Sequence, residues 1–138
     1  MPFKFNEDVA IADIAVEVWA NTIEDLFKDS ALAVSEVMVD TKTVEPRIER
    51  EIILNSDSIE MLLFDFLSEV VYFKDAERLL FSKFEVEIVD SNLRGKFWGE
   101  EIDREKHVLR SDVKAVTLYR FNVRNESGIW RAEFVLDI

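Results

Sequence analysis

Carboxylate oxygens, rather than nucleophiles, are the groups in this chain whose types and positions could do chemistry. The sequence contains no cysteine, so disulfides, thiolate zinc sites and cysteine nucleophiles are excluded. It also lacks the serine-based motif of hydrolases and the glycine-rich motifs of phosphate-binding loops. A search for function therefore starts from the acidic residues.

Two aspartates near opposite ends of the chain are the candidates for a site. Asp13 begins the face of a predicted strand that lies opposite the apolar face, and Asp137 stands beside the α-carboxylate of Ile138. Taken singly, such aspartates are typical of turns, strand edges and solvated surfaces. Together they could form a hard-cation site, because Ca²⁺ and Mg²⁺ bind carboxylate and main-chain oxygens. Spacing alone does not show that they meet, which would require their oxygens to converge within about 5 Å.

His107 is the only histidine, so any role for an imidazole must fall to it. It ends a run of charged residues, 103–107, and a histidine in such a run is typical of a solvated surface. We therefore predict an exposed side chain for His107.

Composition limits the classes of protein that the chain can belong to. Its 138 residues, 49% of them hydrophobic, predict one folded domain over residues 1–138. The net charge of −12 disfavours direct binding to phosphate backbones, so we expect little contact with nucleic acid. No apolar run approaches the ~20 residues of a membrane span, and no signal peptide is visible. We expect a cytoplasmic protein that does not bind membranes.

Hydrophobic periodicity predicts two helices and six strands, with a weaker strand at 3–5. The first helix begins at the capping-box pattern of Thr22 and Asp25, and Asp57 with Glu60 opens the second. The predicted segments are a strand at 12–19, a helix at 22–39, a loop at 40–43, a strand at 47–54, the second helix, and strands at 84–88, 93–102, 115–124 and 129–137.

This order, β-α-β-α-β-β-β-β, predicts an α+β fold with two helices packed on a largely antiparallel or mixed sheet system. The last two strands form a hairpin joined through residues 125–128. The final strand alternates apolar and polar residues up to Asp137 and reaches the end of the chain. A chain end is ordered when it is tied into a sheet, so this strand is expected to be held by neighbours. The order of strands within the sheet does not follow from the sequence.

The chain as a whole resembles the archease family, because a series of short motifs appears in the order that the family shows. The motifs are Ala12-Asp13-Ile14, Val37 to Asp40, Leu62 to Glu69, Leu80 to Phe84, Gly99-Glu100-Glu101-Ile102, His107, Val113 to Thr117, and the terminal Leu136-Asp137-Ile138. They extend over essentially all of the sequence.

The resemblance implies an accessory protein rather than an enzyme. Archeases activate the GTP-dependent RNA ligase that joins tRNA halves, promoting its guanylylation and its multiple turnover in tRNA splicing. The resemblance also implies a bound divalent cation, calcium in some members, whose ligands correspond here to Asp13, Asp137 and Ile138.

This chain departs from the family pattern at two places. Ala10 and Ile11 stand where a histidine and a threonine are often found, and Tyr119 stands where a second histidine is common. The carboxylate ligands remain, and His107 also remains as a residue that could contact the ligase.

Two other functions are compatible with the same residues. A metal-dependent hydrolase could use the carboxylates and would act without a partner. A chaperone-like binding module would suppress aggregation of unrelated proteins and would not depend on Asp137.

Overall fold

The computed structural model of the chain describes residues 2–6 and 13–138. Within them lie seven strands, two α-helices and one short 3-10 helix, which replaces the predicted loop at 40–43. In chain order the elements are β1 (Phe3–Asn6), β2 (Asp13–Ala20), α1 (Ile23–Met38), η1 (Thr41–Thr43), β3 (Ile48–Asn55), α2 (Ile59–Glu77), β4 (Leu79–Val89), β5 (Asn92–Glu101), β6 (Ala115–Glu126) and β7 (Ile129–Asp137).

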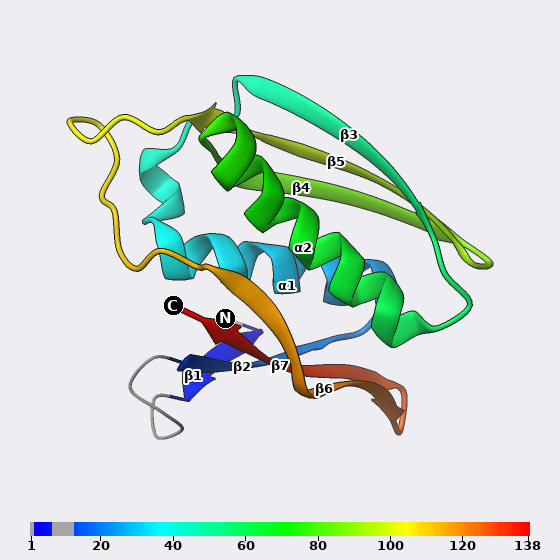
Figure 1. Cartoon of the computed structure of the whole chain (residues 1–138). Coiled ribbons are helices and arrows are strands. Elements are labelled where there is room, and N and C mark those ends of the chain that lie inside the picture. The colour runs from blue at the N-terminus through cyan, green and yellow to red at the C-terminus, as the bar shows by residue number, and fades with distance from the viewer. Residues whose placement is uncertain (1, 7–12) are drawn as a thin grey trace.

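The strands form two antiparallel sheets with both helices between them (Figure 1). One sheet has the order β1-β2-β7-β6, and the other has the order β3-β5-β4. Each helix contacts strands of both sheets. The predicted α+β class and the predicted element order are confirmed, with β1 formed by the weaker segment. Because each sheet has one face against the helices, its other face carries the outward-pointing side chains.

Side-chain caps fix where the helices begin. The hydroxyl of Thr22 accepts a hydrogen bond from the Asp25 amide at 3.1 Å, which confirms the predicted start of α1. The prediction that Asp57 opens α2 was wrong by one residue. The N-cap is Ser58, whose hydroxyl accepts from the Met61 amide at 3.2 Å. Both residue types cap helices well, so the sequence alone does not decide between neighbours.

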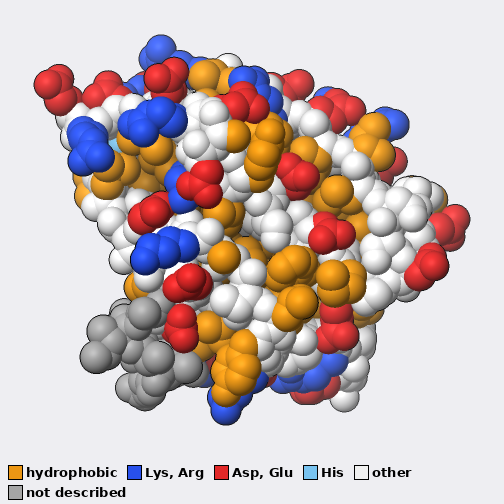
Figure 2. All heavy atoms as spheres, in the orientation of Figure 1, with side chains coloured by type: hydrophobic (Ala, Val, Ile, Leu, Met, Phe, Trp, Pro, Cys, Tyr) orange, Lys and Arg blue, Asp and Glu red, His pale blue; other side chains and the backbone are white. Residues whose placement is uncertain are grey.

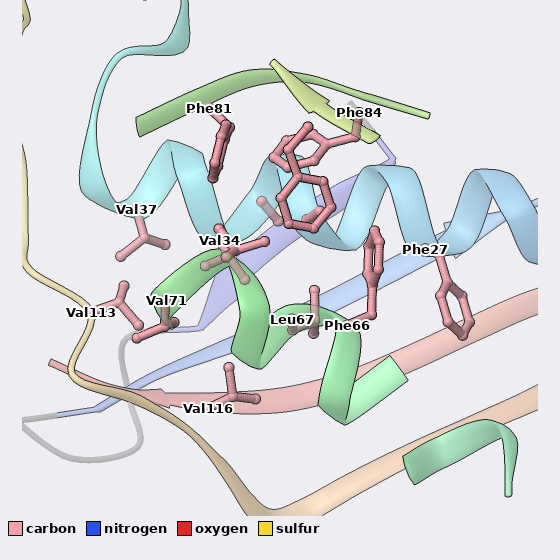
Figure 3. Close-up of a cluster of buried hydrophobic side chains, with 14 of the residues drawn as sticks. Phe27, Val34, Val37, Phe66, Leu67, Val71, Phe81, Phe84, Val113 and Val116 are labelled. Carbon is pink, nitrogen blue, oxygen red and sulfur yellow. The ribbon is translucent and has the colours of Figure 1, made fainter. Parts of the chain in front are cut away.

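Phenylalanines dominate the core that joins the two helices to the three-stranded sheet. Phe66 of α2 lies between Phe27 of α1 and Phe97 of β5, with ring centroids 5.7 and 5.3 Å away. Phe81 and Phe84 of β4 complete the cluster through edge-to-face contacts with Phe97. Such contacts add to the stabilisation that comes from burying the rings. Figure 3 shows side chains of α1, α2 and β4 pointing into this common interior.

Two-residue turns close the hairpins. Val89 pairs with Asn92, and Glu126 pairs with Ile129, so the predicted 125–128 connection is tighter than expected. Ser127 and Gly128 both have positive φ, 54° and 88°, as a two-residue type I′ turn requires.

The segment between β5 and β6, residues 102–114, crosses the C-terminal end of α1. The amides of Arg110 and Ser111 donate to the carbonyls of Met38 and Val37, at 2.8 and 3.0 Å. These bonds satisfy carbonyls that the end of a helix leaves without partners. The segment therefore closes one end of the helical layer and leads directly into β6.

Candidate cation site at the paired ends of β2 and β7

Asp13 and Asp137 stand directly opposite each other at the paired ends of β2 and β7. Directly opposed residues of an antiparallel pair point to the same face of the sheet, with Cβ atoms about 4.5–5.5 Å apart. The apolar Ile14 and Leu136, the next pair along, pack against the core. The two aspartates therefore share the outward face and are half-buried there. The fold brings together the two carboxylates that the sequence placed 124 positions apart, since 137 − 13 is 124.

A second acidic pair on the same face shows how the fold offsets the repulsion between two directly opposed carboxylates. Glu17 is directly opposite Glu133, and each carboxylate has a cationic neighbour on the adjacent strand. Lys4 of β1 approaches Glu17 at 3.0 Å, and Arg124 of β6 approaches Glu133 at 3.1 Å. These cations offset the repulsion that two directly opposed like charges produce in a sheet.

The Asp13–Asp137 pair has no such compensation within residues 2–6 and 13–138. No lysine or arginine among these residues lies within ion-pair distance of either carboxylate. The main-chain oxygen of Asp137 accepts from the Lys114 amide at 2.8 Å, which fixes the strand end next to β6. Two uncompensated carboxylates in a fixed position favour binding of a cation.

The donor set fits a hard divalent cation. Asp13 and Asp137 supply carboxylate oxygens, and Ile138 follows with its side chain against the core, which holds the chain end in place. Ca²⁺ takes about 6–8 oxygen ligands, so these residues would supply part of the coordination sphere. No cluster of three or more His, Cys, Asp or Glu side chains suited to a metal occurs in the described part of the chain. A site here must therefore use main-chain or terminal oxygens besides its two aspartates.

The predicted exposure of His107 was wrong. The residue is only 5% exposed, and its two ring nitrogens are both engaged. Nδ1 accepts a hydrogen bond from the Asp103 amide at 3.0 Å, and Nε2 lies 2.9 Å from Oε1 of Glu100. The amide must donate to Nδ1, so Nε2 carries the proton and donates to the carboxylate. His107 thus holds the 102–114 segment in place instead of facing solvent.

Glu100, which the sequence placed in a family motif without indicating a role, is the acceptor at the centre of this cluster. Its carboxylate also accepts from the Glu45 amide at 2.8 Å and from Nζ of Lys106 at 2.7 Å. Burial raises the pKa of Glu100, but the hydrogen bonds from His107, Lys106 and the Glu45 amide outweigh it and lower that pKa to about 2. No periodic signal marks Glu100, because the alternation of β5 breaks just before it.

Lys74 is a second buried charge that sequence reasoning missed. Its Nζ donates to Asp112 at 2.6 Å and to the Val113 carbonyl at 2.8 Å. Burial opposes the charged form, but the hydrogen bonds and charges of Asp112 and Asp75 leave the pKa of Lys74 raised. A signal was present, because Lys74 continues the helical spacing of Leu67, Val70 and Val71. The ion pair joins α2 to the residues that precede β6 and so supports the strand beside β7.

The family position at Tyr119 lies in a large irregularity of β6. Thr117 pairs with Val135 and Asn122 pairs with Glu133, so residues 118–121 stand opposite Phe134 alone. We call these four residues the β6 bulge. Tyr119 is 59% exposed there, and the other two departures, Ala10 and Ile11, lie outside the described residues.

Comparison with known proteins shows which family the chain belongs to. The model of the Archease protein family (MTH1598/TM1083) matches residues 3–138. The chain belongs to the archease family. A protein archease of Sulfurisphaera tokodaii is 38% identical over 99% of this chain and 98% of its own length. A protein archease of Pyrococcus furiosus is 37% identical over 92% of this chain and 93% of its own.

Solved structures share the archease fold described above. The solution structure of Methanobacterium thermoautotrophicum protein 1598 has a TM-score of 0.86 and 38% identity, covering 99% of each chain. A crystal structure from Thermotoga maritima, described as an archease and possible chaperone, has a TM-score of 0.68 and 15% identity, covering 94% of this chain and 93% of that one.

Neither helix described here is long and apolar enough to cross a membrane.

Proposed function

We propose that this archease is an accessory activator of the GTP-dependent RNA ligase of tRNA splicing, with a divalent cation, most simply calcium, held by Asp13, Asp137 and Ile138. The observation that carries the proposal is the direct pairing of Asp13 with Asp137 in a chain that matches the family over residues 3–138. The two carboxylates are the residues that the family resemblance assigns to the metal. They are paired on the face of the sheet that points away from the helices.

The residues of this chain bind and orient rather than react. The two aspartates would hold the cation, the bond between Lys114 and Asp137 fixes the strand end, and Ile138 anchors the terminus in the core. When bound, the cation supplies a concentrated positive charge that oxygen donors of a partner can complete. A partner shifts an equilibrium of the ligase only by binding one of its states more tightly. We expect this archease to bind the guanylylation-competent state more tightly.

The charge distribution also supports a protein partner. The net charge of −12 opposes the phosphate backbone, and acidic side chains are intermixed with basic ones over the face shown in Figure 2. We therefore place the action of this protein on the ligase rather than on the RNA.

Guanylylation of purified ligase with GTP and Mn²⁺ or Mg²⁺, measured with and without this protein, tests the proposal. Wild type should raise the guanylylation rate and the turnover number. Asp137→Asn should abolish both effects and weaken calcium binding in calorimetry about a hundredfold or more, because even outer-shell partners of a metal contribute about 10- to 100-fold. Glu133→Gln is the matched control for calcium binding, since it removes an acid from the compensated pair on the same face.

The outcomes separate the proposal from its competitors. An unchanged guanylylation rate with wild-type protein would remove the activator role. Hydrolysis of phosphoesters by the isolated protein with Mg²⁺ or Mn²⁺ would favour the hydrolase. Suppression of aggregation of unrelated proteins, unaffected by Asp137→Asn, would favour a chaperone-like module.

A further inference from the structure

The β6 bulge is a built feature rather than a loose insertion. At its start, Oγ1 of Thr117 donates to the Val135 carbonyl at 3.1 Å. At its end, Phe121 returns to the interior and stacks on Phe134, with ring centroids 6.0 Å apart. Nδ2 of Asn122 donates to the Arg120 carbonyl at 3.2 Å. Held at both ends, the bulge has a defined shape, and Figure 1 shows β6 turning sharply along its length.

The bulge turns large side chains toward solvent. Leu118 and Tyr119 are each 59% exposed. Arg120 has a φ of 55°, in the left-handed region, and its guanidinium lies 5.2 Å from the centre of the Tyr119 ring. A non-glycine residue in that region is strained, and such strain concentrates at binding and active sites. Exposed apolar groups on a strained, anchored bulge point to an intermolecular contact.

The bulge lies next to the proposed cation site. Ala115 is directly opposite Asp137, and the bulge begins three residues later, at Leu118. On the outward face of β2 and β7, the pair Ala15 and Val135 follows the aspartates, about 7 Å further along the strands. These two residues and Arg120 line a hollow of about 230 Å³. The bulge, the hollow and the acidic pair therefore form one continuous surface.

We propose that the β6 bulge is the docking element of this surface, with Leu118 and Tyr119 entering an apolar socket of the ligase. This inference rests on the proposed function, because it names the surface by which the same site meets its partner. Arg120 is positive, and a cation held by Asp13 and Asp137 would add positive charge, so the border of the socket carries carboxylate or carbonyl oxygens. Asp13, Asp137 and Ile138 would supply only part of the coordination sphere of the cation, and such oxygens would supply the rest.

The nearby acids argue against RNA as the occupant. An aromatic ring and an arginine together can stack on bases, but four carboxylates lie on the same outward face. They belong to the two directly opposed acidic pairs of β2 and β7. Lys4 and Arg124 offset only one of these pairs, and the whole chain has a net charge of −12, which opposes binding of a phosphate backbone. A protein partner can match the positive and negative positions of this face separately.

The decisive experiment measures the affinity of this protein for purified ligase by calorimetry, in saturating calcium. The double variant Leu118→Ser/Tyr119→Ser should bind ligase at least tenfold more weakly while it binds calcium as wild type does. The matched control is Ile53→Ser/Val89→Ser, which removes two exposed apolar residues, 69% and 58% exposed, from the other sheet. It should leave both affinities unchanged.

Arg120→Gly separates docking from folding. Glycine adopts positive φ freely, so the variant should melt at a temperature equal to or above that of wild type. It should nevertheless bind ligase more weakly, because a positive group has left the surface. Weaker binding with full thermal stability is a result that a purely structural role of the bulge does not give.

Three results would overturn the docking inference. One is wild-type affinity in the bulge variants, and another is equal weakening by the Ile53→Ser/Val89→Ser control. The third is loss of tRNA binding with unchanged ligase affinity, which would assign the bulge to RNA. The proposed function fails separately, if wild-type protein neither binds nor activates the ligase.

Discussion

Two adjacent residues at the end of β5, Gly99 and Glu100, show how single positions hold this fold together. A Cβ at Gly99 would lie 1.8 Å from the Leu80 carbonyl oxygen of the neighbouring strand. Glu100 then connects the end of β5 to the residues around Glu45 and to His107. The Gly-Glu motif therefore has a structural explanation: close backbone approach at one residue and a buried carboxylate at the next.

Gly99→Ala should destabilise the protein severely, by about 4 kcal/mol or more, because the backbone of β4 would have to move. Gly128→Ala is the comparison, since a Cβ there meets nothing within 4 Å and only its φ of 88° is unfavourable. We expect that variant to lose about 1 kcal/mol. Urea denaturation of both variants measures the difference, and equal losses would contradict this explanation.

Glu100→Gln should remove a stabilisation that depends on pH. The pKa of Glu100 is lowered from 4.5 to about 2, so its stabilisation is fully present above pH 4.5 and is lost as the pH falls toward 2. At neutral pH the variant should lose about 2 kcal/mol, the usual size of hydrogen bonds to a charged group. The difference in unfolding free energy between wild type and variant, measured by urea titration from pH 7 to pH 3, should shrink below pH 4.5. A constant difference would show that the carboxylate charge is not responsible.

At the scale of elements, α2 organises one side of the molecule. Its Phe66 centres the aromatic cluster, and its Lys74 fixes the segment that leads into β6. A further contact protects the free edge of β6, where the Glu60 carboxylate accepts from the Val123 amide at 3.0 Å. A sheet edge with satisfied amides is a poor template for aggregation. The position of α2 thus determines both the core and the strand that carries the bulge.

Ser58→Ala should cost about 1 kcal/mol of unfolding free energy, because the hydroxyl caps the first turn of α2. Asp57→Ala should change the same quantity by less than about 0.5 kcal/mol, since Asp57 is exposed and is not the cap. Thermal or urea unfolding of the two variants decides between neighbouring caps. A larger effect of Asp57→Ala would restore the cap expected from the sequence.

At the scale of the whole molecule, the fold joins a strand near the start of the chain to the last strand. β2 pairs with β7 along the full length of β2, from Asp13 with Asp137 to Ala20 with Trp130. Both helices lie between this sheet and the other one, so neither helix covers the outward face (Figure 1). The proposed cation site and the bulge share that face, so both proposals concern the same side of the molecule.

Residues added after Ile138 should weaken the proposed cation site. They convert the α-carboxylate into a peptide group, which removes one negative charge from the ligand set. Calcium should bind an extended protein more weakly in calorimetry than it binds one that ends at Ile138. A protein with the same residues added before Met1 is the control, because it keeps the α-carboxylate of Ile138. Equal calcium affinity in all forms would leave at most the Ile138 carbonyl as a ligand.

The sequence alone was sufficient for the types and order of the main elements and for the faces of β2 and β7. Alternation in β2 and β7 placed Asp13 and Asp137 on the polar faces, because side-chain direction in a strand follows local periodicity. The hydroxyl of Thr22 and the apolar spacing of α1 likewise act within a few residues of one another. The order of the short motifs indicated the family, and the family resemblance implied the ligands Asp13, Asp137 and Ile138. Periodicity and helix capping are local properties, so they could be predicted from neighbouring residues.

Only the tertiary structure decided which distant residues meet. The pairing of Asp13 with Asp137, the burial of His107 against Glu100 and the strained bulge around Arg120 all depend on contacts between segments far apart in sequence. The composition of the charged run 103–107 is the same whether its histidine is exposed or is buried against the Glu100 carboxylate. Long-range register and burial are properties of the packed chain, and no short pattern of residues encodes them.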